Sequence, residues 1–261
     1  MSFYDQGRAY LQKGHYRKAF EYFSLSIKRK IEVTNSYFYR GLSQYYMKQY
    51  TDAIKDFDIA LAEEPDNIDF LFYKAMALYS RFNPTPAVEI LDRIIQLNPE
   101  HAVAIHQKAF IKMNLNQYNE AIDLFNQALT INPNYESCYH NRAFCYDQLK
   151  DFDKAIADYT KVIELKPHFL SFYNRANTYV LLNDFDKALA DYEESLKINP
   201  NYHLTHYSKG IILEQKEDLE NAIQCFQIAL AINPEFELAQ QKLQYYYQLA
   251  QQQQNNQSLE G

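Results

Sequence analysis

The sequence predicts an all-α fold, a solenoid of about seven helix–turn–helix repeats followed by a capping helix. The first observation is an alanine that recurs every 34 residues, with one interval of 33: Ala19, Ala53, Ala87, Ala121, Ala155, Ala188 and Ala222. The second is a proline twelve residues after six of them: Pro65, Pro99, Pro133, Pro167, Pro200 and Pro234. Proline cannot continue a helix, so each one marks the end of a repeat. Self-similarity at this period is typical of repeat solenoids.

Two further columns of residues indicate how the helices of each repeat pack. Twelve residues before each alanine stands a second small residue: Gly7, Gly41, Ala75, Ala109, Ala143, Ala176 and Gly210. Four residues after each alanine stands a large one: Phe23, Phe57, Leu91, Phe125, Tyr159, Tyr192 and Phe226. We therefore expect the helix backbones to approach closely at the small residues, with the large side chains filling the core.

Each repeat is expected to contain a first helix, a short turn, a second helix and a link. The expected repeats are residues 1–33, 34–67, 68–101, 102–135, 136–168, 169–202 and 203–236. In the fifth repeat, the helices are predicted over 136–149 and 153–165. The third repeat has an unusual turn, Asn83-Pro-Thr-Pro86, in which a threonine cap followed by proline is expected to start the second helix.

The end of the chain is expected to close the array. An amphipathic capping helix over 237–250 would cover the last repeat with Leu238, Leu243, Tyr246 and Leu249, because terminal repeats need a cap. Residues 251–261, rich in glutamine and asparagine, are expected to form a disordered tail. We expect a single continuous array over 1–250, since a solenoid grows by addition and needs no single globular core.

The pattern of small, large, small and proline residues resembles the tetratricopeptide repeat. Tyr173-Asn-Arg-Ala176 and Ala188-Leu-Ala-Asp-Tyr192 are similar to the Asn-Arg-Gly and Ala-Asp-Tyr variants of that family. The resemblance covers about residues 1–236. It implies antiparallel helix pairs stacked into a right-handed superhelix whose concave groove is lined by the first helices. A fold of this kind leaves the bound partner open.

Composition and charge exclude several classes of function. The net charge of −7 argues against a general nucleic-acid binder, which needs clustered lysine and arginine. The sequence contains no run of 18 apolar residues and no secretory pattern at its start, so we expect a soluble, cytoplasmic chain without membrane insertion. Cys138 and Cys145 are roughly 10 Å apart along one expected helix, too far for a disulfide. We expect all three cysteines to be buried and reduced.

A polar column thirteen residues before each alanine predicts how the repeats are braced. Wherever it holds arginine, an aspartate stands three residues after the alanine, in the pairs Arg40 with Asp56, Arg142 with Asp158 and Arg175 with Asp191. A guanidinium suits a carboxylate between packed helices. Where it holds lysine, the later position is apolar, and we expect the lysine head to remain in water. The alternative is a strip of cations for acidic ligands.

Three columns of the first helices are expected to face the groove, at 15, 11 and 8 residues before each alanine. The candidate binding residues are Phe38, Leu42, Tyr45, Phe72, Met76, Tyr79, His106, Phe110, Met113, His140, Phe144, Tyr173 and Asn177. In repeats two to four, eight of these nine positions are apolar or tyrosine, and an exposed patch of that kind normally marks a binding surface. The alternative is that neighbouring aromatic residues bury one another by packing.

These residues predict a non-enzymatic interaction scaffold that binds an apolar or amphipathic peptide or helix in its groove. No phosphate loop, metal-spaced cysteine and histidine set or nucleophile motif occurs, so no cofactor or metal is expected. His106 and His140 share a column, but no carboxylate that could orient them is evident. Self-association is left open.

Two alternative functions are weighed against the scaffold. In a heat-shock co-chaperone, a family clamp grips acidic termini, but its positions here hold Tyr4, Arg8, Tyr39, Asp69 and Tyr73 instead. In the substrate-recognition region of a larger enzyme, such as the O-GlcNAc transferase, asparagines line the superhelix. Only Asn141 and Asn174 occupy the comparable column.

Overall fold

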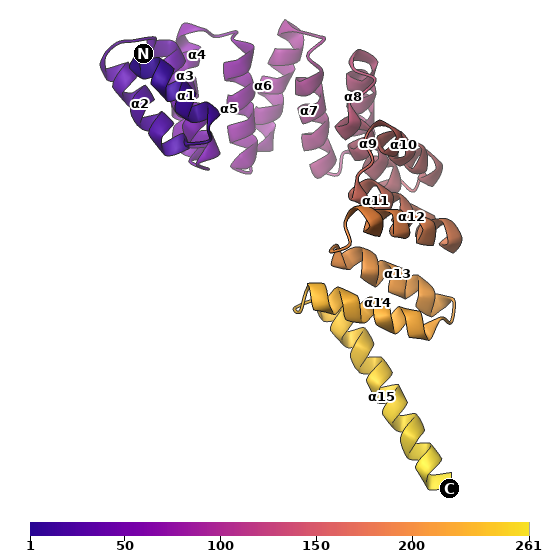
Figure 1. Cartoon of the computed structure of the whole chain (residues 1–261). Coiled ribbons are helices and arrows are strands. Elements are labelled where there is room, and N and C mark those ends of the chain that lie inside the picture. Colours follow the sequence, from indigo (N-terminus) through magenta and orange to yellow (C-terminus); the bar gives the residue numbers. More distant parts are fainter. Residues whose placement is uncertain (261) are drawn as a thin grey trace. The chain divides into compact units, whose positions relative to one another are not determined.

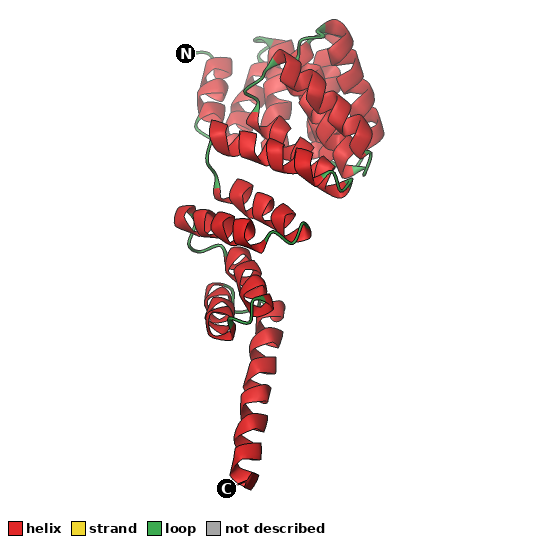
Figure 2. Cartoon of the chain, turned by 90° about the vertical axis from the view of Figure 1, so that its right-hand side faces the viewer, coloured by secondary structure: helices red, strands yellow, loops and turns green. Residues whose placement is uncertain are grey.

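The computed structural model describes residues 1–260, and side chains as far as residue 252. Over these residues the chain consists of helices without strands (Figures 1 and 2). The first helices of the repeats are α1 (Phe3–Gln12), α3 (Val33–Tyr46), α5 (Ile68–Ser80), α7 (Ala102–Asn114), α9 (Glu136–Gln148), α11 (Phe169–Leu181) and α13 (His203–Gln215). The second helices are α2 (Tyr16–Lys28), α4 (Tyr50–Glu63), α6 (Pro84–Leu97), α8 (Tyr118–Ile131), α10 (Phe152–Leu165), α12 (Phe185–Ile198) and α14 (Leu219–Ile232). The last helix is α15 (Glu237–Glu260).

The chain forms two compact units, which we call unit 1 (Met1–Tyr135) and unit 2 (Glu136–Gly261). Unit 1 contains α1–α8 and unit 2 contains α9–α15. Within each unit, a first helix packs against the second helix of its own repeat and, after the first repeat of the unit, against the preceding second helix as well. The boundary falls between the expected fourth and fifth repeats. That the two units form one continuous array stays a prediction from the sequence.

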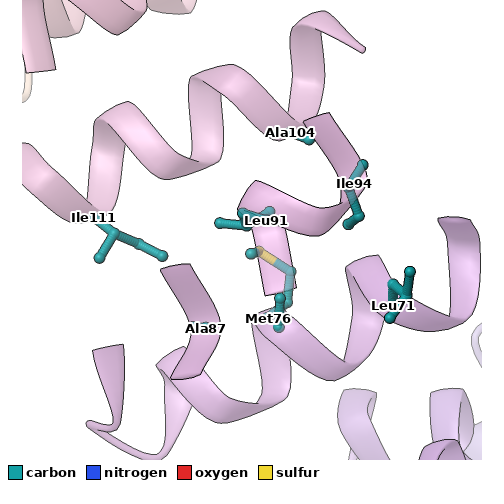
Figure 3. Packing of buried hydrophobic residues seen from close by; sticks show 8 residues of the cluster. Leu71, Met76, Ala87, Leu91, Ile94, Ala104 and Ile111 are labelled. Atoms are coloured by element: carbon teal, nitrogen blue, oxygen red, sulfur yellow. The ribbon is translucent and has the colours of Figure 1, made fainter. Parts of the chain in front are cut away.

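The columns of small and large residues form the core of both units, as predicted. All seven alanines of the 34-residue repeat are fully buried, and the large residues four positions later are at most 1% exposed. A Cβ atom added at Gly41 would lie 2.8 Å from Phe57 Cε1, and one added at Gly210 would lie 2.6 Å from Phe226 Cε1. These glycines are therefore required by close helix packing. Figure 3 shows one such core in unit 1, where Met76 lies among Leu91 and its neighbours between α5, α6 and α7.

The turns between the two helices of each repeat share one backbone feature that the sequence columns did not reveal. The residue five positions before each buried alanine has a positive φ, between 59° and 74°: Gly14, Lys48, Phe82, Asn116, Lys150, Asn183 and Glu217. Only glycine, and to a lesser degree asparagine, adopts this conformation easily. The repeated chain reversal thus imposes the left-handed conformation even on Phe82, whose side chain is 95% exposed.

Two helix boundaries differ from the predictions. Helix α6 begins at Pro84, not after a threonine cap at Thr85, because Pro84 is accommodated in the first turn, where the amide of proline is not needed. Helix α15 continues through residues 251–260, where the composition predicted a disordered tail. Gly261, the last residue of that predicted tail, lies outside the described residues.

The start of α15 caps unit 2. Leu243 is buried and, with Tyr246, packs against Phe226 of the last repeat. Ala239 is fully buried, whereas Leu238, expected on the capping face, is 50% exposed. None of the helices described has the length and apolar composition needed to cross a bilayer.

Candidate functional site

Five of the thirteen candidate binding residues lie in the core of unit 1. They are Phe38, Leu42, Met76, His106 and Met113, each at most 9% exposed. Phe38 shows why: its ring lies 4.5 Å from that of Phe70 and 5.8 Å from that of Phe57, measured between centroids. Neighbouring helices approach closely enough to cover these side chains. Burial in the core thus leaves these five little surface for a ligand, and for Phe38 the neighbouring aromatic rings account for it.

The other four candidates of unit 1 are partly exposed and connect three successive first helices. They are Tyr45 of α3, Phe72 and Tyr79 of α5, and Phe110 of α7. The rings of Tyr79 and Phe110 meet edge to face at 6.2 Å, and the Asn114 amide donates a 2.9 Å hydrogen bond to the Tyr79 hydroxyl. The partly exposed candidates thus continue from one repeat to the next.

Tyr73 belongs to the same surface, although the three sequence columns omitted it. Its ring lies 6.1 Å from that of Tyr45 and 5.6 Å from that of Phe72. Burial and the nearby Tyr46 raise the pKa of Tyr73 to about 12, so its hydroxyl stays protonated at neutral pH. Tyr39 and Tyr73 form a column one residue after that of Phe38 and Phe72, and including this column would have identified Tyr73 from the sequence. We call Tyr45, Phe72, Tyr73, Tyr79 and Phe110 the aromatic strip.

The four candidates of unit 2 have more polar surroundings. Asn177 accepts a 2.5 Å hydrogen bond from the Tyr192 hydroxyl, and a side-chain nitrogen of Asn174 lies 3.5 Å from His140 Nε2. Burial, with His168 nearby, lowers the pKa of His140. Tyr173 packs edge to face against Tyr202 at 5.3 Å, while Phe144 is 41% exposed. In unit 2, the candidate side chains are therefore held by hydrogen bonds as much as by aromatic packing.

Two acidic residues in the third column of unit 2 connect successive first helices. Asp147 of α9 accepts hydrogen bonds from the hydroxyls of Tyr159, at 3.0 Å, and Thr178, at 2.9 Å. Burial raises the pKa of Asp147, and these two bonds only partly offset it. Glu214 of α13 accepts hydrogen bonds from Lys242 and Tyr246 of α15, and these outweigh its burial and lower its pKa. We therefore assign both carboxylates a packing role.

The predicted arginine–aspartate pairs are present. In each pair, two guanidinium nitrogens donate to the two carboxylate oxygens at 2.6–2.7 Å: Arg40 with Asp56, Arg142 with Asp158, and Arg175 with Asp191. The aspartates are 4–6% exposed. Each pair joins the first and second helix of one repeat. Bidentate geometry in a partly buried site makes these strong, specific contacts.

The lysines of the same column bond differently from the prediction. Their ammonium groups pair with carboxylates on the second helix of the preceding repeat: Lys74 with Asp58 at 2.6 Å, Lys108 with Asp92 at 2.5 Å, and Lys209 with Glu193 at 2.9 Å. The prediction named no partner within the chain for these lysine heads, and each has a partly exposed carboxylate as partner. An acidic residue five positions after the preceding alanine was the signal missed. Since acids within the chain pair with these cations, the column does not form an open strip for acidic ligands.

The described residues contain no cluster of three or more histidine, cysteine, aspartate or glutamate side chains that could hold a metal. Cys138, Cys145 and Cys225 are buried free thiols, and burial raises the pKa of Cys138 and of Cys145 to about 12. At that pKa these two thiols are protonated at neutral pH and poor nucleophiles. His106 lies against Tyr135 at 4.8 Å between ring centroids, and burial lowers its pKa to about 4.

Comparison with protein-family models matches both units. Tetratricopeptide repeat models match residues 2–30, 137–169, 170–202 and 203–236. A model of anaphase-promoting complex, cyclosome, subunit 3 matches residues 47–128. The chain is a tetratricopeptide repeat protein with an all-α solenoid fold. No curated protein matched the sequence.

Solved structures of tetratricopeptide repeat proteins have the same fold. The C-terminal part of one from Cytophaga hutchinsonii is 16% identical and has a TM-score of 0.76, covering 92% of this chain and 99% of that one. One from Parabacteroides merdae is 18% identical with a TM-score of 0.68, covering 93% and 96%. YrrB, described as having an unusual peptide-binding site, is 20% identical with a TM-score of 0.60, covering 71% and 96%. The fold is thus one used by protein-interaction scaffolds.

Proposed function

We propose that this chain is a non-enzymatic scaffold that binds a peptide or amphipathic helix on the aromatic strip of unit 1. The observation that carries the proposal is two ring contacts between partly exposed aromatic side chains, Tyr45 with Tyr73 between α3 and α5, and Tyr79 with Phe110 between α5 and α7. Aromatic residues supply much of the binding energy at protein interfaces, because they bury a large area with little loss of side-chain entropy. Their spacing along stacked helices suits an elongated ligand.

The charges around the strip favour an apolar ligand over an acidic one. Helices α3, α5 and α7 carry four lysine and arginine residues, and each is paired with an acid of the chain: Arg40, Lys74, Lys108 and Lys112, the last with Glu120 at 2.9 Å. A ligand carboxylate would have to compete with these partners for the cations. An apolar side chain on the strip meets no such competition. The tyrosine hydroxyls and the Asn114 amide provide polar groups at the edge of the same surface.

A peptide as ligand is also in keeping with the fold. YrrB, which has the same fold at low sequence identity, has an unusual peptide-binding site. That likeness supports the class of ligand, while the choice of the aromatic strip rests on the exposure and contacts of its own residues.

The proposal can be tested with peptides selected from a displayed random library against the full chain. We expect Phe110→Glu to weaken the binding of the selected peptides by about 2 kcal/mol, roughly thirtyfold, because a charge would be placed against an apolar contact. Phe82→Glu is the matched control, since Phe82 is a 95% exposed phenylalanine in the turn after α5 and is not one of the residues of the strip. Fluorescence anisotropy at several salt concentrations measures both effects.

Binding should depend little on salt, because charge screening leaves apolar contacts unchanged. Peptides that bind both variants equally well would place the binding surface elsewhere. An affinity that collapses between low and moderate salt but survives Phe110→Glu would indicate that the cations bind the ligand, and would overturn the proposal.

A further inference from the structure

Helix α15 uses only part of its surface to cap unit 2. One side packs on the last repeat, where Leu243 is buried and Lys242 bonds to Glu214. Next to this packed side of α15, residues of α14 and α15 line a cleft of about 640 Å³ that is open to solvent. The lining includes Gln240, Gln244, Tyr247 and Gln248 of α15, together with Gln227 and Leu230 of α14. Gln240, Gln244 and Gln248 lie four residues apart and Tyr247 lies three after Gln244, so these residues form a stripe along one side of the helix. Figure 1 shows α15 extending beyond α14.

The cleft lacks the small residue against which another repeat of the same kind would pack. In a complete repeat, the next second helix would place a large side chain against a small residue of the first helix, as Phe226 does against Gly210. The equivalent position in α15, 34 residues after Gly210, holds Gln244. A glutamine is larger than the glycine against which Phe226 packs, so this position does not offer a large residue the same space. A partner that binds in this cleft is therefore expected to contact glutamine side chains and not to insert a large aromatic side chain.

The charge of this surface points to a second copy of the chain. From Leu243 to residue 252 the sequence contains no acidic or basic residue, although the chain as a whole carries a net charge of −7. Two identical charged surfaces repel each other, whereas two identical uncharged ones do not. A glutamine amide carries both a donor and an acceptor, so a surface of glutamines can hydrogen-bond to its own copy. Tyr247 and Leu230 add apolar area to the same cleft.

We propose that the chain forms a two-fold homodimer in which α15 of each copy lies in the α14–α15 cleft of the other. Such an interface is isologous, so it closes at two copies. It uses residues of unit 2 alone and does not depend on the aromatic strip of unit 1.

The test compares two exposed tyrosines of one helix. Tyr247 is 58% exposed and lines the cleft, while Tyr245 is 54% exposed and lies outside its lining. In the proposed dimer, Tyr247→Glu brings two new negative charges into one interface, and we expect the dimer dissociation constant to rise by at least roughly tenfold. Tyr245→Glu adds the same charge to the same helix and should leave the dimer intact. Sedimentation equilibrium of the full-length proteins at several concentrations measures the constant.

A second variant guards against misfolding of the first. Gln244→Glu with Gln248→Glu should also dissociate the dimer, and circular dichroism should show unchanged helix content in all variants. A wild-type chain that is monomeric at every concentration would overturn the proposal. So would masses that rise past the dimer with concentration, because they indicate head-to-tail stacking, or equal effects of Tyr245→Glu and Tyr247→Glu.

Discussion

Successive first helices contact one another through aromatic rings in unit 1 and largely through hydrogen bonds in unit 2. Tyr45 meets Tyr73, and Tyr79 meets Phe110, across the helices of unit 1. In unit 2, the equivalent region joins Asp147 to Thr178 and Glu214 to Lys242. The buried alanines and the large core residues occupy the same columns in both units. The core of each helix pair therefore does not fix the residues through which successive first helices contact one another. Those residues, and with them the chemistry of ligand recognition, can vary on the same scaffold.

The largest expected effect concerns the arginine pairs, which both units share. Arg40→Ala should destabilise unit 1 by about 3 kcal/mol, because it leaves the carboxylate of Asp56 buried without its cation. Arg175→Ala should cost about 1 kcal/mol more in unit 2, since Arg175 also donates a 2.8 Å hydrogen bond to Thr160 of the preceding repeat. Urea unfolding with hydrogen exchange resolved by helix measures each unit.

A double-mutant cycle of Arg175 and Asp191 isolates their interaction. Additive effects would show that the two residues stabilise the repeat independently. If Arg40→Ala and Arg175→Ala lower the free energy of unfolding of their units equally, the expected difference between the two units does not exist.

The next effect is an acid sensitivity of unit 1. Burial lowers the pKa of His106 from 6.5 to about 4, so the folded state binds the proton more weakly than the unfolded state does. Neutral His106 makes its full contribution to the free energy of unfolding above pH 6.5. As the pH falls towards 4, that free energy decreases by roughly 2 to 3 kcal/mol. His106→Phe, which keeps a ring beside Tyr135, should remove most of that loss.

Chemical unfolding between pH 7 and pH 4 gives the pH profile of each variant. The surface substitution His15→Phe is the control for replacing a histidine with phenylalanine elsewhere in unit 1. A profile that is the same for His106→Phe and the wild type would show that His106 does not cause the acid sensitivity.

The smallest effect tests the polar contacts that distinguish unit 2. Thr178→Val removes a buried hydrogen bond to Asp147 and should cost about 1 to 2 kcal/mol, because the carboxylate keeps its burial and loses a donor. Tyr79→Phe removes the bond from Asn114 in unit 1, where water can replace it, and should cost about 0.5 kcal/mol or less. If Thr178→Val and Tyr79→Phe shift the midpoint of thermal unfolding by similar amounts, the polar contacts do not distinguish unit 2 from unit 1.

The candidate site was only partly predictable from the sequence. The column that holds Phe38, Phe72 and His106 was correctly assigned to the first helices, yet Phe38 and His106 are buried while Phe72 is partly exposed. Exposure depends on how closely the next helix approaches, and that distance is set by side chains from other repeats. Tyr73 joins the surface for the same reason.

The sequence by itself determined the helical repeats, their core and the arginine–aspartate pairs. A buried alanine such as Ala53 and a large neighbour such as Phe57 act at fixed spacing within one helix pair, so their roles follow from local periodicity. Only the tertiary structure decided that Lys108 reaches back to Asp92 of the preceding repeat, and that α14 and α15 leave a cleft beside Gln244. These features depend on contacts between repeats, where the geometry of stacking and not the spacing along one helix determines which side chains meet.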